Sequence, residues 1–207
     1  MKNRVVITGL GVITSNATNI GEFKDAIHEG RSGIEFIPRL EEMKFGCRIG
    51  GVTKPLTENQ HDFLKKVQIP PSGDTTGYAV FAAIEAWKDA GFEIDTNQDE
   101  ADWDTGAMMG CGVSDMKTIA GTLIPKVNMG KARRMGSQIV EQVMGSGVSA
   151  SIGGVLGLGN QVTSNSSACN TGAEAIVEST WRIRTGRAKR MLAGGVEGSS
   201  PYIWAGF

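Results

Sequence analysis

Two patterns of apolar residues alternate along the chain. Short runs of apolar and small residues, typical of buried strands, occupy residues 4–13, 106–112, 161–164 and 190–197. Apolar positions recur at helical spacing in residues 21–29, 57–67, 75–91, 137–156 and 171–184. This alternation predicts a layered α/β fold with a mostly parallel sheet, in which residues 106–112 form a central strand.

The remaining segments give weaker signals. Residues 46–53 predict a second, exposed strand, whereas residues 32–38 are expected to be irregular and residues 117–135 to form a long connection. Residues 137–156 predict a helix in two parts, because two glycines interrupt it near position 146. Gly186 is expected to close the helix over 171–184, since glycine readily adopts the left-handed conformation of a helix C-cap.

Composition and charge exclude several classes of protein. Hydrophobic residues make up 40% and charged residues 21% of the chain, which is a globular balance. The net charge of −1 gives no support to a nucleic-acid partner or an anionic membrane surface. No apolar stretch approaches the roughly 18 residues of a membrane helix, and the first apolar run is too short for a signal peptide.

The three cysteines, Cys47, Cys111 and Cys169, are odd in number and widely spaced. The chain has no C-x-x-C pair, which argues against a zinc site or a disulfide framework, and reduced thiols in a cytoplasmic protein fit best. Glycine pairs near residues 9 and 110 lack the third glycine of a dinucleotide fingerprint, and no P-loop lysine motif occurs. We therefore expect neither a metal nor a nucleotide cofactor.

Cys169 has the best setting for chemistry. It follows a short predicted strand and precedes a strong predicted helix, so its side chain is expected at a helix N-terminus. The partial positive charge there favours a thiolate, and free backbone N–H groups can hold an oxyanion, which suits nucleophilic acyl transfer. Local physics leaves a second interpretation open, in which Cys169 is a small buried residue, the common fate of a free cysteine.

Five segments resemble, in the same order, the β-ketoacyl-[acyl-carrier-protein] synthases I and II. The run SSACNTGA at residues 166–173 is similar to the active-site cysteine segment of that family. The others are RVVITGLG at 4–11, AAIEA with DAG at 82–91, SGVSA at 146–150 and AGGVE at 193–197. Five ordered segments are more specific than one cysteine motif, and the resemblance covers nearly the whole chain.

The resemblance implies a thiolase-like fold of two similar halves, each a five-stranded mixed sheet with helices on both faces. It also implies that Cys169 takes an acyl group from the phosphopantetheine arm of an acyl carrier protein. Condensation with decarboxylated malonyl-carrier protein would follow, in fatty acid or polyketide biosynthesis. The expected partners are acyl carrier protein and a second synthase subunit, in a homodimer or a heterodimer, and no further cofactor is expected.

The same resemblance suggests roles for other residues, each with a plainer alternative. Met144, Val113 and Phe207 match positions near the acyl-binding tunnel, with Met144 contributed across a dimer interface; the alternative is ordinary core, which we prefer for Val113. Four basic residues match carrier-protein docking positions, and the alternative is a solvated surface. They are Lys65, Lys66, Arg133 and Arg134.

The chain departs from the family in its histidines and its extent. The family uses two histidines and a lysine in its second half, whereas the only histidines here, His28 and His61, fall on predicted surface helices. We therefore expect residues 1–207 to be an N-terminal half, with the other half on a second chain or lost by cleavage. Two alternatives remain: a non-catalytic partner resembling chain-length factors, and an acyltransferase of the same fold that does not condense. Asn170, where the family more often has alanine or threonine, leaves the acyl preference open.

Overall fold

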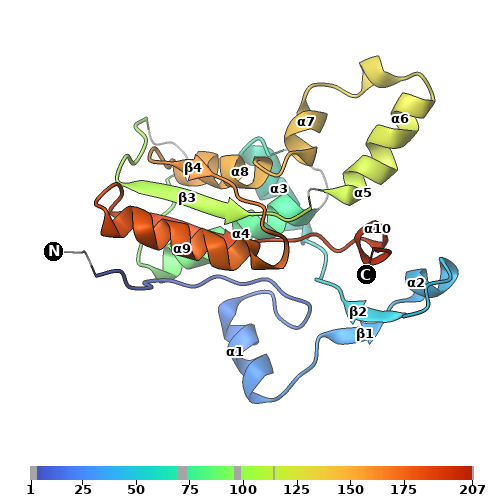
Figure 1. Ribbon diagram of the computed structural model, residues 1–207, viewed down its shortest axis with the longest axis horizontal. Helices are drawn as coiled ribbons and strands as arrows, with labels where there is room; N and C mark the ends of the chain where they lie inside the picture. Colours follow the sequence, from blue (N-terminus) through green and yellow to red (C-terminus); the bar gives the residue numbers. More distant parts are fainter. Residues whose placement is uncertain (1–3, 70–73, 96–98, 114, 207) are drawn as a thin grey trace.

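The computed structural model describes residues 4–69, 74–95, 99–113 and 115–206 (Figure 1). A three-stranded parallel sheet has the strand order β4-β3-β5. β3 spans Thr105–Gly110, β4 spans Val162–Thr163 and β5 spans Arg190–Gly195. Since β3 has a neighbour on each side, the prediction of a central strand at residues 106–112 is confirmed.

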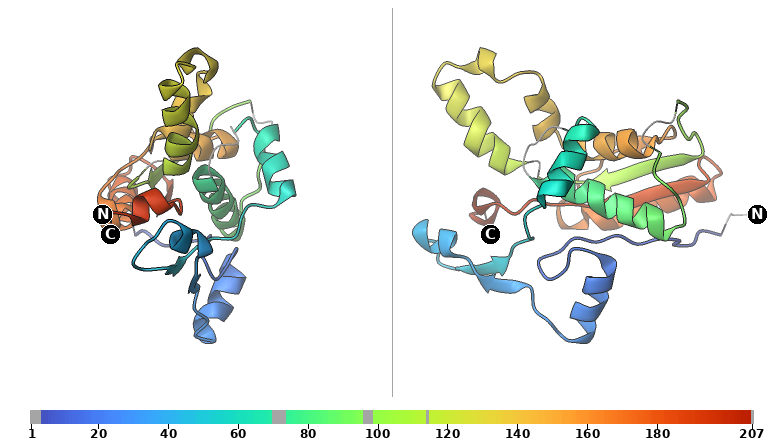
Figure 2. Two further views of the ribbon diagram at one scale, coloured as in Figure 1. Left: turned by 90° about the vertical axis from the view of Figure 1, so that its right-hand side faces the viewer. Right: turned by 180° about the vertical axis from the view of Figure 1, so that it is seen from behind.

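Helices cover both faces of this sheet (Figures 1 and 2). α9, Thr171–Arg184, packs on one face against β3 and β5. α8, Gly147–Leu156, packs on the other face, and α4, Asp74–Asp89, packs against α8. The main apolar core lies on the α8 side, where Ile152 and Ala107 are fully buried. The predicted α/β layering is confirmed.

The remaining elements surround this centre. α1 spans Ile20–His28, α2 spans Pro38–Glu42, α3 spans Glu58–Lys66 and α10 spans Pro201–Trp204. β1, Ile34–Phe36, pairs antiparallel with β2, Ile49–Gly51. α6, Ile124–Asn128, and α7, Gln138–Val143, project from one side of the sheet, and α1 lies on the opposite side (Figure 1). Among the described residues, no helix is both long enough and apolar enough to span a membrane.

Local sequence explains where the helices begin and end. Thr57 forms a capping box with Gln60, which satisfies free N–H groups at the start of α3. α9 covers the predicted range 171–184. Gly186, just beyond its end, has the left-handed φ of +74° that is expected of a glycine closing a helix. The interruption predicted within 137–156 separates α7 from α8.

The prediction of a buried strand at residues 4–13 is wrong. This segment pairs with no strand in the described part of the chain, and Val6, Ile7 and Leu10 are exposed. Carboxylates of α4 hold it instead: Leu10 N donates to Asp89 Oδ2, and Val12 N donates to Glu85 Oε2, both at 2.9 Å. The apolar residues are present, but no neighbouring strand completes their burial.

Two further segments are more regular than predicted. Residues 34–36 form β1 instead of an irregular stretch, because the exposed strand β2 provides their partner. Within the connection predicted at 117–135, α5, Met116–Thr118, continues through a π-helical turn, Ile119–Leu123, into α6. Pro125 argued against a helix in the sequence, because proline has no N–H donor. The π-helical turn before Pro125 is wider than an α-helical turn and accommodates it.

Candidate functional site

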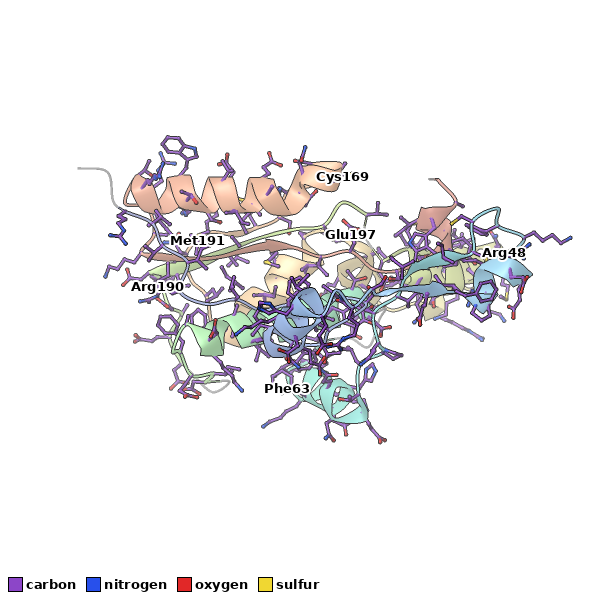
Figure 3. The ribbon with its side chains drawn as sticks, turned by 90° about the horizontal axis from the view of Figure 1, so that it is seen from below. Arg48, Phe63, Cys169, Arg190, Met191 and Glu197 are labelled. Atoms are coloured by element: carbon purple, nitrogen blue, oxygen red, sulfur yellow. The ribbon has the colours of Figure 1, made fainter. Side chains whose placement is uncertain are left out.

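The segments that follow β3, β4 and β5 meet at one edge of the parallel sheet. Cys111 N donates to Asn165 O at 3.2 Å, and Val196 N donates to Gly110 O at 3.0 Å, so the three strand ends are joined directly. Ligands of open parallel sheets bind at this carboxyl edge, where loops and helix N-termini converge. Cys169 lies here, at the beginning of α9 (Figure 3).

A strained turn presents Cys169 to solvent. Its predecessor Ala168 has a φ of +49°, a left-handed conformation that costs a residue with a Cβ atom roughly 1–2 kcal/mol. Thr171 braces the turn, because its Oγ1 donates to Ala168 O at 2.6 Å and accepts from Ser167 N at 2.8 Å. Backbone strain of this kind gathers at functional sites. Cys169 itself is exposed, which excludes the buried-residue interpretation in this structure.

Glycines let α9 approach the strand ends closely. A Cβ atom on Gly195 would lie 2.9 Å from Gly172 Cα, and one on Gly110 would lie 1.9 Å from Thr171 Cγ2. Neither position has room for a side chain. The first turn of α9 therefore lies directly against β3 and β5, where its dipole can stabilise an anion formed beside Cys169.

Glu197 binds the loop that faces this turn. Its Oε1 accepts the N–H of Gly112 in a short hydrogen bond, and its Oε2 accepts the N–H of Val113 at 3.2 Å. Gly112 O in turn accepts from Ser166 Oγ at 3.2 Å. A single carboxylate thus connects the end of β5 to the loop after β3, and that loop contacts the nucleophile turn.

The other two thiols have different surroundings. Cys111 is buried, and its Sγ lies 3.1 Å from Val113 O. Burial first, and then the negative charges of Glu197 and Asp115, raise the pKa of Cys111 to about 11. Cys47 is exposed and lies two residues before β2. Cys111 is thus a packing residue, as the sequence predicted, although it lies next to the site.

The structure describes two of the three residues that the sequence assigned to an acyl-binding tunnel. Val113 is exposed and lies in the loop held by Glu197, so its expected role as ordinary core is not what the structure shows. Met144 ends α7, is half exposed and lines a cavity of about 580 Å³ with the end of α3 and with α8. Phe207 lies outside the described residues.

The two basic pairs are exposed and lie on separate elements. Lys65 and Lys66 end α3, where Lys65 forms an ion pair with Asp62 at 2.9 Å. Arg133 and Arg134 lie in a 3-10 turn, Ala132–Arg134, between α6 and α7. The end of α3 lies beside α7, because the two line one cavity, whereas the 3-10 turn lies on the segment that projects from the sheet (Figures 1 and 2).

The histidines and possible metal ligands contribute nothing at this edge. His28 is exposed at the end of α1, and His61 is half-buried on α3, so the sequence-based view of both as fully solvated holds only for His28. Within the described residues, no three His, Cys, Asp or Glu side chains gather as a metal site would require.

Sequence reasoning found Cys169 but missed the groups that support it. Glu197 and Ser166 belong to two of the segments that resemble the family, but the sequence predicted no role for either residue. The available signal was that Glu197 ends the strand predicted at residues 190–197, since polar residues at the carboxyl ends of parallel strands share one edge. Its bonds to Gly112 and Val113 cross 85 and 84 positions of sequence and have no local pattern.

The chain is similar to known proteins over its whole length. The chain is 31% identical over 210 residues to 3-oxoacyl-[acyl-carrier-protein] synthase 2 of Synechocystis sp., with 100% of this chain and 48% of the relative covered. A β-ketoacyl synthase structure from Burkholderia phymatum is similar with a TM-score of 0.84 at 25% identity, over 100% of this chain and 50% of that one. The ishigamide ketosynthase/chain length factor gives 0.82, with the same identity and coverage.

The chain thus spans about half the length of the curated relatives it matches. Residues 2–207 match the family model described as "Beta-ketoacyl synthase, N-terminal domain". This match covers the exposed cysteine, the strained turn and the converging strand ends. The chain belongs to the β-ketoacyl synthase family, as its N-terminal domain.

Proposed function

We propose that this chain is the acyl-accepting half of a 3-oxoacyl-[acyl-carrier-protein] synthase. Cys169 Sγ attacks the acyl carbon of a carrier-bound thioester, and the phosphopantetheine thiol leaves with the proton that Cys169 loses. Malonyl-carrier protein then loses carbon dioxide, and the resulting carbanion attacks the acyl carbon. That step leaves the 3-oxoacyl product on the carrier protein and expels the Cys169 thiolate, which takes up a proton from solvent.

The observation that carries the proposal is the exposure of Cys169 on a strained turn at the start of a 14-residue helix. A chain-length-factor-like partner is the second candidate, because one similar structure is a ketosynthase/chain length factor. Such a partner has no need of a nucleophile, so an exposed cysteine at this position favours catalysis. An acyltransferase that does not condense is the third candidate, and it would share the first step.

The sheet supports the proposal that further polypeptide completes the fold. A cavity of about 620 Å³ is lined by residues 4–14 and β5, and also by residues of α4 and α9. Within the described residues, β5 has a strand neighbour on one side only, and residues 4–13 have none. Ser179 Oγ on α9 is buried beside this cavity without a hydrogen-bond partner. An additional extended segment between residues 4–13 and β5 would use these backbone groups and fill the space.

The outer face of α9 supports the same proposal. Ile176, Val177 and Trp181 are about half exposed on this helix. Val6 and Ile7 are exposed as well, and exposed apolar side chains gathered on one helix are typical of a surface that binds further polypeptide. We propose that the second half covers these faces and brings the histidines and lysine that the family requires, as a second chain or as a continuation of this one.

Acylation of Cys169 tests the first step. The chain is incubated with an acyl-carrier thioester, and its intact mass and peptide map are recorded. We expect the mass to increase by one acyl group located on Cys169, no increase for Cys169→Ala, and normal acylation for the control Cys111→Ala. An acyl group on another residue, or none, would favour the chain-length-factor alternative.

A further inference from the structure

We infer that Glu197 is a positioning residue, which sets the geometry of the nucleophile turn through the loop after β3. The inference rests on the proposed acyl transfer to Cys169. Glu197 lies two residues beyond β5, and both of its carboxylate oxygens accept consecutive backbone N–H groups, those of Gly112 and Val113. Charge-assisted bonds of this kind are about twice as strong as neutral ones, so one side chain fixes two residues of the loop.

The held loop contacts both the carboxylate and the turn. A Cβ atom added to Gly112 would be 2.7 Å from Glu197 Oε1 and 3.7 Å from Ala168 Cα. The loop also bonds the turn, because Gly112 O accepts from Ser166 Oγ at 3.2 Å. Figure 3 shows Glu197 and Cys169 at the same end of the molecule's central layers. A change in the Glu197 contact therefore reaches the turn through a single residue.

The strained backbone makes the turn dependent on such support. Ala168 has a φ of +49°, and this conformation persists only where surrounding contacts over-determine it. Thr171 holds the turn from the helix side, through its bonds to Ser167 and Ala168. Gly112 and Ser166 hold it from the strand side, and Glu197 fixes Gly112. If this outer support is lost, the turn can relax and Cys169 moves relative to the start of α9.

Two substitutions separate geometry from charge. Glu197→Gln keeps the side-chain length but removes the charge and one acceptor, since an amide NH₂ cannot accept from an N–H donor. Glu197→Asp keeps the charge but is one methylene too short to reach both amides. Glu178→Gln, an exposed carboxylate further along α9, is the matched control. All variants are made in the complete protein, with the polypeptide that completes it.

The readouts are kcat and KM for acyl transfer from acyl-carrier protein, and the rate of Cys169 alkylation by iodoacetamide. We expect both Glu197 variants to lower kcat about tenfold or more, because small misplacements of a reacting atom are costly. KM should stay within about twofold, and alkylation should slow in both. If Glu197 acted only through its charge, the result would differ. Glu197→Gln would then speed alkylation, because it removes a negative charge near a thiolate, and Glu197→Asp would react like the parent protein.

Ser166→Ala provides a second route if the Glu197 variants fold poorly. It removes the Ser166–Gly112 bond from an exposed side chain, and it should slow acylation in the same direction by a smaller factor. Because both residues act through Gly112, the double variant should lose less than the product of the two single losses. Multiplicative losses, or unchanged kcat and alkylation in every variant, would overturn the inference. Absence of acylation in the parent protein would instead contradict the proposed function, and alkylation would still test positioning.

Discussion

At the scale of single residues, two cysteine thiols near the candidate site have opposite surroundings. Cys169 and Cys111 lie in adjoining segments, yet one is exposed on a turn and the other is buried with a pKa raised to about 11. The sequence singled out Cys169 because a helix start follows it. The exposure of Cys169 and the two bonds of Glu197 were not predictable, since they depend on contacts between residues far apart in the chain.

The two thiols should differ sharply in reactivity. At pH 8, a thiol with a pKa of about 11 exists as thiolate in about one molecule per thousand, and the thiolate is the reactive form. In a Cys47→Ser background, which removes the second exposed thiol, iodoacetamide should modify Cys169 and leave Cys111 intact. Peptide mass mapping measures this. Comparable modification of both residues would show that Cys111 is neither buried nor shifted.

Asp102 should contribute to stability in a pH-dependent way. Burial pushes its pKa up, but hydrogen bonds from Thr105, Arg190 and the Asp104 backbone outweigh burial, so the pKa lies below the usual 3.8. A lowered carboxyl pKa stabilises the fold above the unfolded-state value, and this stabilisation is lost as pH falls. Asp102→Asn should therefore reduce the free energy of unfolding by about 1–2 kcal/mol at pH 7.

Urea unfolding at pH 7 and pH 3 measures the effect of Asp102→Asn. The difference between this variant and the parent should shrink at pH 3. Asp99→Asn, which changes an exposed carboxylate before β3, should change stability little at either pH. A difference for Asp102→Asn that grew towards low pH would have the wrong sign for this account.

At the scale of elements, features set by local sequence were predicted and features set by distant partners were not. α9 was predicted at its observed limits, because its apolar spacing and the glycine that follows are local features. Residues 4–13 were wrongly predicted as a buried strand, because burial of a strand requires partners that local sequence does not reveal. The helix through Pro125 was missed, because a π-helical turn absorbs the proline.

Close packing of α9 on β5 should be sensitive to one added methyl group. In Gly195→Ala, the new Cβ atom would lie 2.9 Å from Gly172 Cα, and it would push the start of α9 away from the sheet. We expect a loss of about 1–3 kcal/mol in stability, typical of overpacking, together with slower acylation of Cys169. Thermal unfolding and intact-mass kinetics measure the two effects.

Gly154→Ala is the matched control for Gly195→Ala. Gly154 lies on α8, and a Cβ atom there would meet nothing within 4 Å. Alanine should raise helix stability by up to about 1 kcal/mol at that position and leave acylation unchanged. Equal effects of the two substitutions would argue against a close contact between α9 and β5.

At the scale of the whole molecule, the chain forms a layered core but leaves a slot beside β5 and an exposed apolar face on α9. The resemblance implied five strands in each half, and the described sheet has three with the antiparallel pair β1–β2 apart from it. The sequence could suggest an incomplete fold through its missing histidines. The slot itself required the three-dimensional structure, because segments near the two ends of the chain line it.

Docking of an acyl carrier protein on the exposed arginine pair stays a prediction at this scale. Arg133 and Arg134 lie on the projecting segment between α6 and α7, exposed to an approaching acidic partner. Arg133→Glu with Arg134→Glu should raise KM for acyl-carrier protein by about tenfold with little change in kcat, because complementary charge mainly governs encounter. The same charge change at Lys24 and Arg39, on α1 and α2, should leave KM unchanged. Steady-state acylation kinetics measure KM for both double variants. An equal rise in KM for the two pairs would contradict a specific docking role for Arg133 and Arg134.

The most direct test of the central claim is to add malonyl-carrier protein to the acylated chain and follow its intact mass. The claim is that residues 1–207 supply the acyl acceptor, while other polypeptide supplies the groups for condensation. The account predicts that one acyl group stays on Cys169 and that no 3-oxoacyl product forms until the completing half is added. Formation of that product by the 207-residue chain alone, or failure of Cys169 to take the acyl group at all, would contradict it.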